Sequence, residues 1–298
     1  MADSFLFKSV SEPVVLVRRF AFSLAIATFF LMALGSATRV MNAGLSCPDW
    51  PLCYGELVPA AQMNLQVFLE WFHRLVASTV GLLTATFLGI ALWYRKSLPR
   101  WLPVAAGWAF FLVLFQGILG GLTVTELLRF DIVTAHLGTG LMFFCTWLVI
   151  TVTLLPYQAY NTVGKLPWFG SAAAAFVYLQ SILGALVASR WAVHQCLAGA
   201  ELCSVVNTHI AGVVPASLST LAVIYLSWRT TALHPALRRL AYTAGIFLLM
   251  QVAIGIGTYM LHLQIEPLTV LHQAVGAALL GTLVAFTALA WRDRTEAA

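Results

Sequence analysis

Charged residues are scarce in this 298-residue chain: Asp, Glu, Lys and Arg make up 9% of it, whereas hydrophobic residues make up 61%. Soluble domains carry about 25% charged residues, so this composition excludes a soluble protein and is typical of a polytopic membrane protein. The excess of 16 Lys and Arg over 11 Asp and Glu is small. It indicates orientation in a membrane and no binding to nucleic acid.

The sequence also lacks a small-residue cleavage site after its first apolar run, which follows Arg18 and Arg19. We therefore expect that run to be a retained span rather than a removed signal peptide. A span needs about 20 apolar residues, and eight segments meet this criterion: 20–38, 66–94, 103–124, 132–155, 168–188, 204–228, 238–260 and 268–291. The breaks between them are too short for a second soluble domain. The predicted fold class is an all-α integral membrane protein with eight transmembrane helices.

Lys and Arg gather at one set of helix ends, on the side shared by both termini: Lys8, Arg18, Arg19, Arg95, Lys96, Arg100, Lys165, Arg229, Arg238, Arg239, Arg292 and Arg294. The other side holds Arg39, Arg129 and Arg190, with Arg74 just inside the second helix. The positive-inside rule then predicts that both termini are cytoplasmic. We expect a multi-pass protein of a bacterial cell membrane.

Internal repeats indicate a tandem duplication. The segment QGILGGLT, which begins at Gln116, is echoed by QVAIGIGT from Gln251 and more loosely by QSILGAL from Gln180. Two pseudo-symmetric four-helix bundles are therefore predicted, at 1–160 and 161–298. Because each half has four helices, both copies have the same orientation in the membrane, unlike the inverted repeats of many transporters.

Four histidines follow the duplication. His73 and His136 are 63 residues apart, as are His209 and His272, and each lies near the start of an even-numbered helix. A single intramembrane histidine is often an interhelical hydrogen-bonding residue. Four at repeated depths favour a cofactor cage inside each bundle. Planar haem, whose iron accepts axial imidazole nitrogens, suits such a pair.

The two halves differ in one acidic residue. Glu70 stands three residues before His73 and on the same helix face, whereas Val206 occupies the equivalent position before His209. Glu70 is either a surface carboxylate, paired with Arg74 or solvated, or a proton donor and acceptor beside a bound macrocycle.

Arginines near the predicted sites are candidates for binding haem propionates. Arg74, Arg39 and Arg190 could donate charge-assisted hydrogen bonds to carboxylates. Each could equally be an interfacial residue whose long side chain reaches the membrane surface.

The loop GLSCPDWPLCYG (44–55), the EWFHR of the second helix, and His136, His209 and His272 at matching places resemble the haem A synthase family over nearly the whole chain. The resemblance implies oxidation of the ring methyl of haem O, through hydroxylated intermediates, to the formyl group of haem A for cytochrome oxidase.

In that family pattern the first half holds the substrate haem O between His73 and His136, with Glu70 as the catalytic residue. The second half holds a permanent haem b, whose iron is bound by His209 and His272. Implied partners are haem O synthase and an external thiol or electron-transfer protein, besides membrane lipid.

The loop cysteines lie on the side where disulfides persist. Cys47 and Cys53 can close a small ring that is either a structural lid or a redox relay to an external thiol. Cys196 and Cys203, which lack the Pro-Asp-Trp-Pro insert, are expected to form a plain structural disulfide.

Two other functions remain open from the sequence. A two-haem bis-histidine cytochrome would transfer electrons without altering its haems, and Glu70 would then be incidental. A transporter with parallel repeats would use the histidines to line a pathway.

Overall fold

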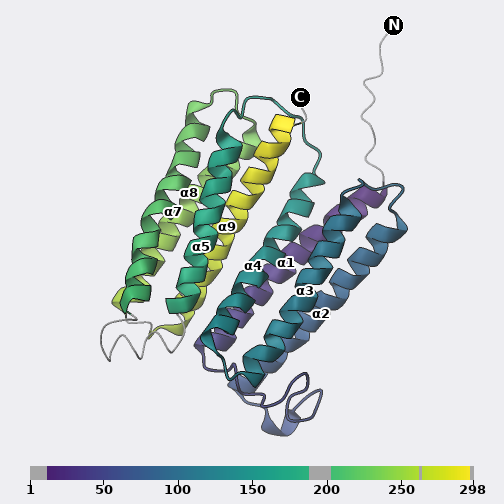
Figure 1. Ribbon diagram of the computed structural model, residues 1–298, viewed down its shortest axis with the longest axis vertical. Helices are drawn as coiled ribbons and strands as arrows, with labels where there is room; N and C mark the ends of the chain where they lie inside the picture. The colour runs from purple at the N-terminus through teal and green to yellow at the C-terminus, as the bar shows by residue number, and fades with distance from the viewer. Residues whose placement is uncertain (1–11, 188–202, 262–263, 296–298) are drawn as a thin grey trace.

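The computed structural model describes residues 12–187, 203–261 and 264–295, which form eight long α-helices and one short 3₁₀ helix without a β-strand (Figure 1). The helices are α1 (Glu12–Val40), η1 (Ala60–Gln62), α2 (Leu65–Trp93), α3 (Leu102–Thr125), α4 (Phe130–Thr153), α5 (Leu166–Val187), α7 (Cys203–Arg229), α8 (Pro235–Met260) and α9 (Glu266–Thr295). All eight α-helices are long and apolar enough to cross a membrane. The predicted fold class is confirmed, and the protein is an integral multi-pass membrane protein.

Helical structure follows from the solvent. In hydrocarbon every backbone N–H and C=O must be satisfied inside the segment, which a helix achieves. Local signals fix where helices begin: the side chain of Asn64 accepts a hydrogen bond from the backbone N–H of Val67, and His234 accepts one from Ala236.

The first helix differs most from its predicted limits, because α1 begins at Glu12 and not near residue 20. The additional turns are held by packing, since Val17 and Ala21 are fully buried in the core of the first four helices. Glu12 in the first turn also interacts favourably with the helix dipole. The apolar run alone could not reveal either contribution.

The helices pack as two groups of four (Figure 1). In the first group α1 and α3 each contact α2 and α4; in the second α5 and α8 each contact α7 and α9. Contacts of α9 with α1 and α4, and of α4 with α5, join the groups. This is the arrangement expected for two bundles, although the assignment of a separate function to each remains a prediction.

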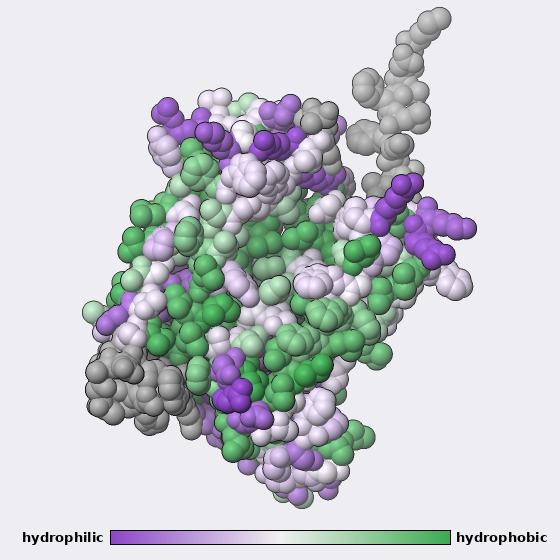
Figure 2. All heavy atoms as spheres, viewed as in Figure 1, coloured by the Kyte–Doolittle hydropathy of each residue, from purple (hydrophilic) through white to green (hydrophobic). Residues whose placement is uncertain are grey.

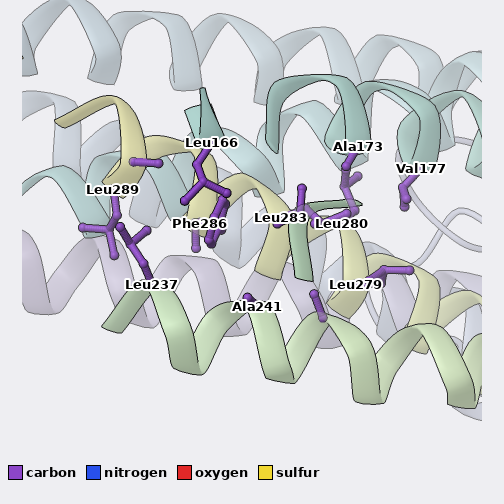
Figure 3. Close-up of a cluster of buried hydrophobic side chains, with 14 of the residues drawn as sticks. Leu166, Ala173, Val177, Leu237, Ala241, Leu279, Leu280, Leu283, Phe286 and Leu289 are labelled. Atoms are coloured by element: carbon purple, nitrogen blue, oxygen red, sulfur yellow. The ribbon is translucent and has the colours of Figure 1, made fainter. Parts of the chain in front are cut away.

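Helix α9 is the most enclosed of the eight, because 67% of its apolar 18-residue segment is buried. Figure 3 shows Leu279, Leu280, Leu283, Phe286 and Leu289 of α9 among side chains of α5 and α8. On another side, a Cβ atom added at Gly281 would lie 2.8 Å from Leu148 Cδ1 of α4. Such close approach at a small residue is how helices associate in membranes, and it brings the two groups together.

The surface has the distribution expected of a membrane protein. In Figure 2 hydrophobic residues cover the flanks and hydrophilic residues gather mainly towards the two ends. Large apolar side chains such as Leu82, Val104 and Leu249 are at least 70% exposed. Exposed apolar area of this extent is stable against lipid and not against water.

The helix connections allow a test of orientation. Arg95 follows α2 and Arg229 ends α7, at the end of the molecule where α1 begins, whereas Tyr54 lies at the other end. Reporter domains fused after Arg95 or Arg229 are expected to be active in the cytoplasm, and one inserted at Tyr54 only outside it. The opposite pattern of reporter activity would invert the topology.

Candidate functional site

The four predicted histidines lie within the first three turns of four helices: His73 in α2, His136 in α4, His209 in α7 and His272 in α9. Within each pair the two histidines lie on opposite helices of one group, because α2 and α4 share the neighbours α1 and α3, and α7 and α9 share the neighbours α5 and α8. The structure therefore brings the predicted residues together as two pairs, one in each group of four helices.

Every imidazole lies against a glycine of the preceding helix. A Cβ atom added to Gly35 of α1 would lie 2.8 Å from Cε1 of His73, and one added to Gly255 of α8 would lie 2.9 Å from Cε1 of His272. The corresponding distance is 3.6 Å for Gly120 with His136 and 3.1 Å for Gly184 with His209. No larger residue leaves the ring room at the tightest of these contacts.

The imidazole nitrogens fit a haem iron. Nδ1 of His73, His136 and His272 is buried and has no hydrogen-bond partner among the described residues. A buried polar atom without a partner is costly. If one ring nitrogen bound the haem iron, that nitrogen would gain a partner, and the other would carry a proton that needs an acceptor. Nor do three His, Cys, Asp or Glu side chains cluster in this part of the chain as they would around a metal ion held by protein ligands alone.

Glu70 is buried, with 4% of its surface exposed, which excludes a solvated surface carboxylate. Its Oε2 accepts a hydrogen bond of 2.8 Å from the backbone N–H of Cys47, and its Oε1 accepts one of 2.6 Å from Nη2 of Arg74. The pairing with Arg74 considered from the sequence is thus present. It fixes the carboxylate between α2 and the outer loop.

Arg74 faces the loop. Its Nη1 donates to the carbonyl oxygens of Asp49 at 2.6 Å and Leu52 at 2.5 Å, and its Nη2 donates to that of Cys47 at 3.3 Å. These bonds hold the irregular backbone that the two prolines impose. The expected contact of Arg74 with a haem propionate stays a prediction, since its guanidinium is already engaged.

Arg39 offers a different cation. It lies one turn after Gly35 on the same face of α1, is partly buried, and has no hydrogen bond or ion pair within the described segments. A cation in this setting is available to an anionic group, and none of the described residues supplies one.

The loop between α1 and α2 is closed by a disulfide between Cys47 and Cys53. Inside it the carboxylate of Asp49 accepts hydrogen bonds from the backbone N–H groups of Tyr54 (2.6 Å) and Gly55 (2.8 Å). The Gly55 bond above all lowers the pKa of Asp49 below its ordinary value. Tyr54 and Gly55 both have positive φ, which the turn requires.

The loop contacts α3 next to the first histidine pair. A Cβ atom on Gly121 of α3 would lie 3.3 Å from Cδ2 of Trp50, and the neighbouring Gly120 faces His136. The loop therefore packs on the end of the first bundle at which these histidines lie. The expected Cys196–Cys203 disulfide, like Arg190, lies outside the described residues.

Three glutamines, Gln116, Gln180 and Gln251, mark the duplication in the sequence, which predicted no site role for them. In the structure each glutamine side chain contacts the histidine of the following helix. The sequence signal for this contact is the glycine four residues after each glutamine, because in the structure that glycine faces the imidazole.

Comparison with known proteins identifies the family of the chain. The COX15-CtaA family, described as cytochrome oxidase assembly protein, matches residues 18–284. The chain belongs to this family. Its members include proteins named heme A synthase to which the chain is similar: that of Shewanella oneidensis is 26% identical, over 90% of this chain and 95% of its own.

Other relatives of this family are similar over comparable lengths. The heme A synthase of Caulobacter vibrioides is 29% identical and covers 98% of this chain and 99% of its own. The mouse protein heme A synthase COX15 is 27% identical over 83% of this chain and 75% of its own. The similarity therefore extends through both groups of four helices.

The glycine contacts yield a prediction. Gly255→Ala places a methyl group against His272, and such overpacking costs about 1–3 kcal/mol, roughly a 5- to 150-fold loss of haem affinity. We expect a lower ratio of haem to protein after purification. Gly89→Ala is the control, because a Cβ there meets nothing within 4 Å. Equal haem content in both variants would contradict the proposed packing.

Proposed function

We propose that this protein is a haem A synthase, an oxidoreductase that converts the ring methyl of haem O, through hydroxylated intermediates, to the formyl group of haem A. One observation carries the proposal: a buried carboxylate, Glu70, stands three residues before His73, whereas Val206 occupies the equivalent position before His209. A pair that serves electron transfer needs no acid or base, whereas a haem that is chemically altered does.

We assign haem O to the first bundle, between His73 and His136, and haem b to the second, between His209 and His272. Haem b, when bound, supplies a one-electron redox centre. The four histidines would hold the two haems, and Trp50 with the rest of the loop would limit access of water to the first site. The position of Arg39 suits a propionate of haem O, since its guanidinium is unpaired among the described residues.

Glu70 is placed to accept a proton that leaves the oxidised methyl group. Each of its oxygens accepts one hydrogen bond, and a carboxylate oxygen has a second lone pair that can take up a proton. Arg74, which three loop carbonyls hold in place, keeps the carboxylate oriented.

Several features of the cellular setting belong to the proposal. Both termini lie in the cytoplasm of a bacterium, the loop lies outside, and haem O synthase delivers the substrate. Cys47 and Cys53 are 0% and 2% exposed, and thiol exchange needs access to a sulfur. This burial favours a structural disulfide; a redox relay to an external thiol protein would require the loop to open.

Extraction and chromatography of the bound haems test the function. The purified protein is expected to contain haem O or haem A together with haem b. His209→Leu and His272→Leu should remove haem b, whereas His73→Leu and His136→Leu should remove the farnesylated haem. Haem b alone in the wild-type protein would identify an electron-transfer cytochrome, and four unchanged variants would rule out both sites.

Replacement of Glu70 tests the proton-transfer role. Glu70→Gln removes the titratable group, and general acid–base groups contribute about 100- to 10,000-fold to rate. Cells that rely on this variant are expected to accumulate haem O or a hydroxylated intermediate, as measured by chromatography of their haems. Haem A at the wild-type level would reduce Glu70 to a loop anchor.

A matched control separates catalysis from loop structure. Gln at position 70 can accept only one of the two hydrogen bonds, so the variant also loosens the loop. Asp49→Asn causes a comparable loss, since its carboxylate also accepts two hydrogen bonds, in this case both from backbone N–H groups, and it leaves Glu70 intact. Haem A production should persist in Asp49→Asn if Glu70 acts on protons.

A further inference from the structure

In the second bundle both histidines are held by a glutamine of the preceding helix. Gln180 Nε2 donates a 2.7 Å hydrogen bond to the carbonyl oxygen of His209 and lies 3.1 Å from its Nδ1. Gln251 Nε2 lies 3.2 Å from Nε2 of His272. Each haem b ligand is thus positioned by an amide side chain from a neighbouring helix.

In the first bundle only one histidine has this support. Gln116 Nε2 donates a 2.8 Å hydrogen bond to the carbonyl oxygen of His136. The residue that corresponds to this glutamine on α1, four positions before the glycine that faces His73, is Leu31. A leucine side chain has no hydrogen-bonding group, so His73 lacks the contact.

The helix that carries the histidine also differs. Each supported histidine is followed, three or four residues later, by a glycine against which the glutamine lies: Gly140, Gly212 and Gly276. A Cβ atom at Gly276, for example, would be 3.1 Å from Gln251 Nε2. Four residues after His73 the chain has Ala77. The first helix pair therefore lacks both the glutamine and the space for it.

Unpartnered atoms show what the glutamines can do when iron is bound. Oε1 of Gln251 and Nδ1 of His272 are both buried without a partner in the described chain, and the same is true of Gln116 and His136. A histidine that gives one nitrogen lone pair to iron carries a proton on the other nitrogen, and this N–H needs an acceptor. The glutamine oxygen can accept it after a rotation of the ring or a flip of the amide, which interchanges the amide oxygen and nitrogen.

We propose that the glutamines hold three of the four histidine ligands in place, and that His73, which has no glutamine, is the ligand that releases its haem. The first site can then exchange product for substrate, while the second site retains its cofactor. Gln116, Gln180 and Gln251 are positioning residues in this scheme. It rests on the proposed function for the identity of each haem, but the difference between the helix pairs is independent of it.

The difference matches what each site has to do. A substrate haem must enter and a product haem must leave on every turnover, whereas a redox cofactor has to stay. Loss of a partner that orients a metal-ligating histidine typically weakens metal binding about 10- to 100-fold. With His136 supported and His73 unsupported, one axial bond of the first site can open without loss of the other.

Haem release to apomyoglobin, a soluble haem acceptor, tests the proposal on the full-length protein in detergent. We expect a fast and a slow phase in the absorbance change. Gln251→Leu, which copies the residue found on α1, should accelerate the slow phase about 10- to 100-fold and leave the fast phase unchanged. Gln66→Leu, the same substitution at an exposed position in α2, is the control.

The converse variant adds the missing support. Leu31→Gln with Ala77→Gly introduces the glutamine and its space, and it should slow the fast phase by about 10-fold or more. General destabilisation cannot produce slower release, so this result separates positioning from loss of folding. If Gln251→Leu does not fold, Gln180→Leu tests the other ligand of the same haem.

The outcomes separate this proposal from the proposed function. A slow phase that is unchanged in Gln251→Leu and Gln180→Leu, or equally faster in Gln66→Leu, would overturn the role of the glutamines. Chromatography of the transferred haem reports separately on identity. If the fast phase contained haem b and no haem O, the proposed function would fail while the expected change in the slow phase would still support the glutamines.

Discussion

An imidazole ring that lies directly against the backbone of a neighbouring helix is the contact on which both proposed haem sites depend. Helices pack about 8–10 Å apart, depending on the side chains between them, and a histidine fills that space most closely where the opposite residue has no side chain. At Gly35, Gly184 and Gly255 even a methyl group would press on the imidazole, whereas at Gly120 the contact is looser. The spacing of the helices and the direction of each ring are therefore set together.

The sequence was sufficient for the helices and for the pairing of the histidines. A run of about 20 apolar residues has few alternatives in lipid, and a duplication that repeats a 63-residue spacing brings equivalent residues to equivalent depths. The pairing of Glu70 with Arg74 was one of the alternatives that the sequence left open, and the structure contains it. These inferences needed only the apolar run, the repeat spacing and the geometry of a single helix.

Other features required the three-dimensional arrangement. The direction of Arg74 depends on where the loop carbonyls lie, and two prolines with a disulfide give the loop a path that no periodicity encodes. The contact of Gln251 with His272 crosses between helices, so the repeated glutamine was visible in the sequence without its purpose. The early start of α1 depended on the burial of Val17 in the same way.

Cys47 joins two parts of the molecule that are chemically distinct. Its sulfur closes the loop, while its backbone N–H donates to Glu70 and its carbonyl oxygen accepts from Arg74. A newly inserted chain whose cysteines are still reduced does not yet have this loop fixed over the carboxylate. The disulfide therefore restrains the same backbone that donates to Glu70 and accepts from Arg74, so closure of the loop and placement of the carboxylate are linked through one residue.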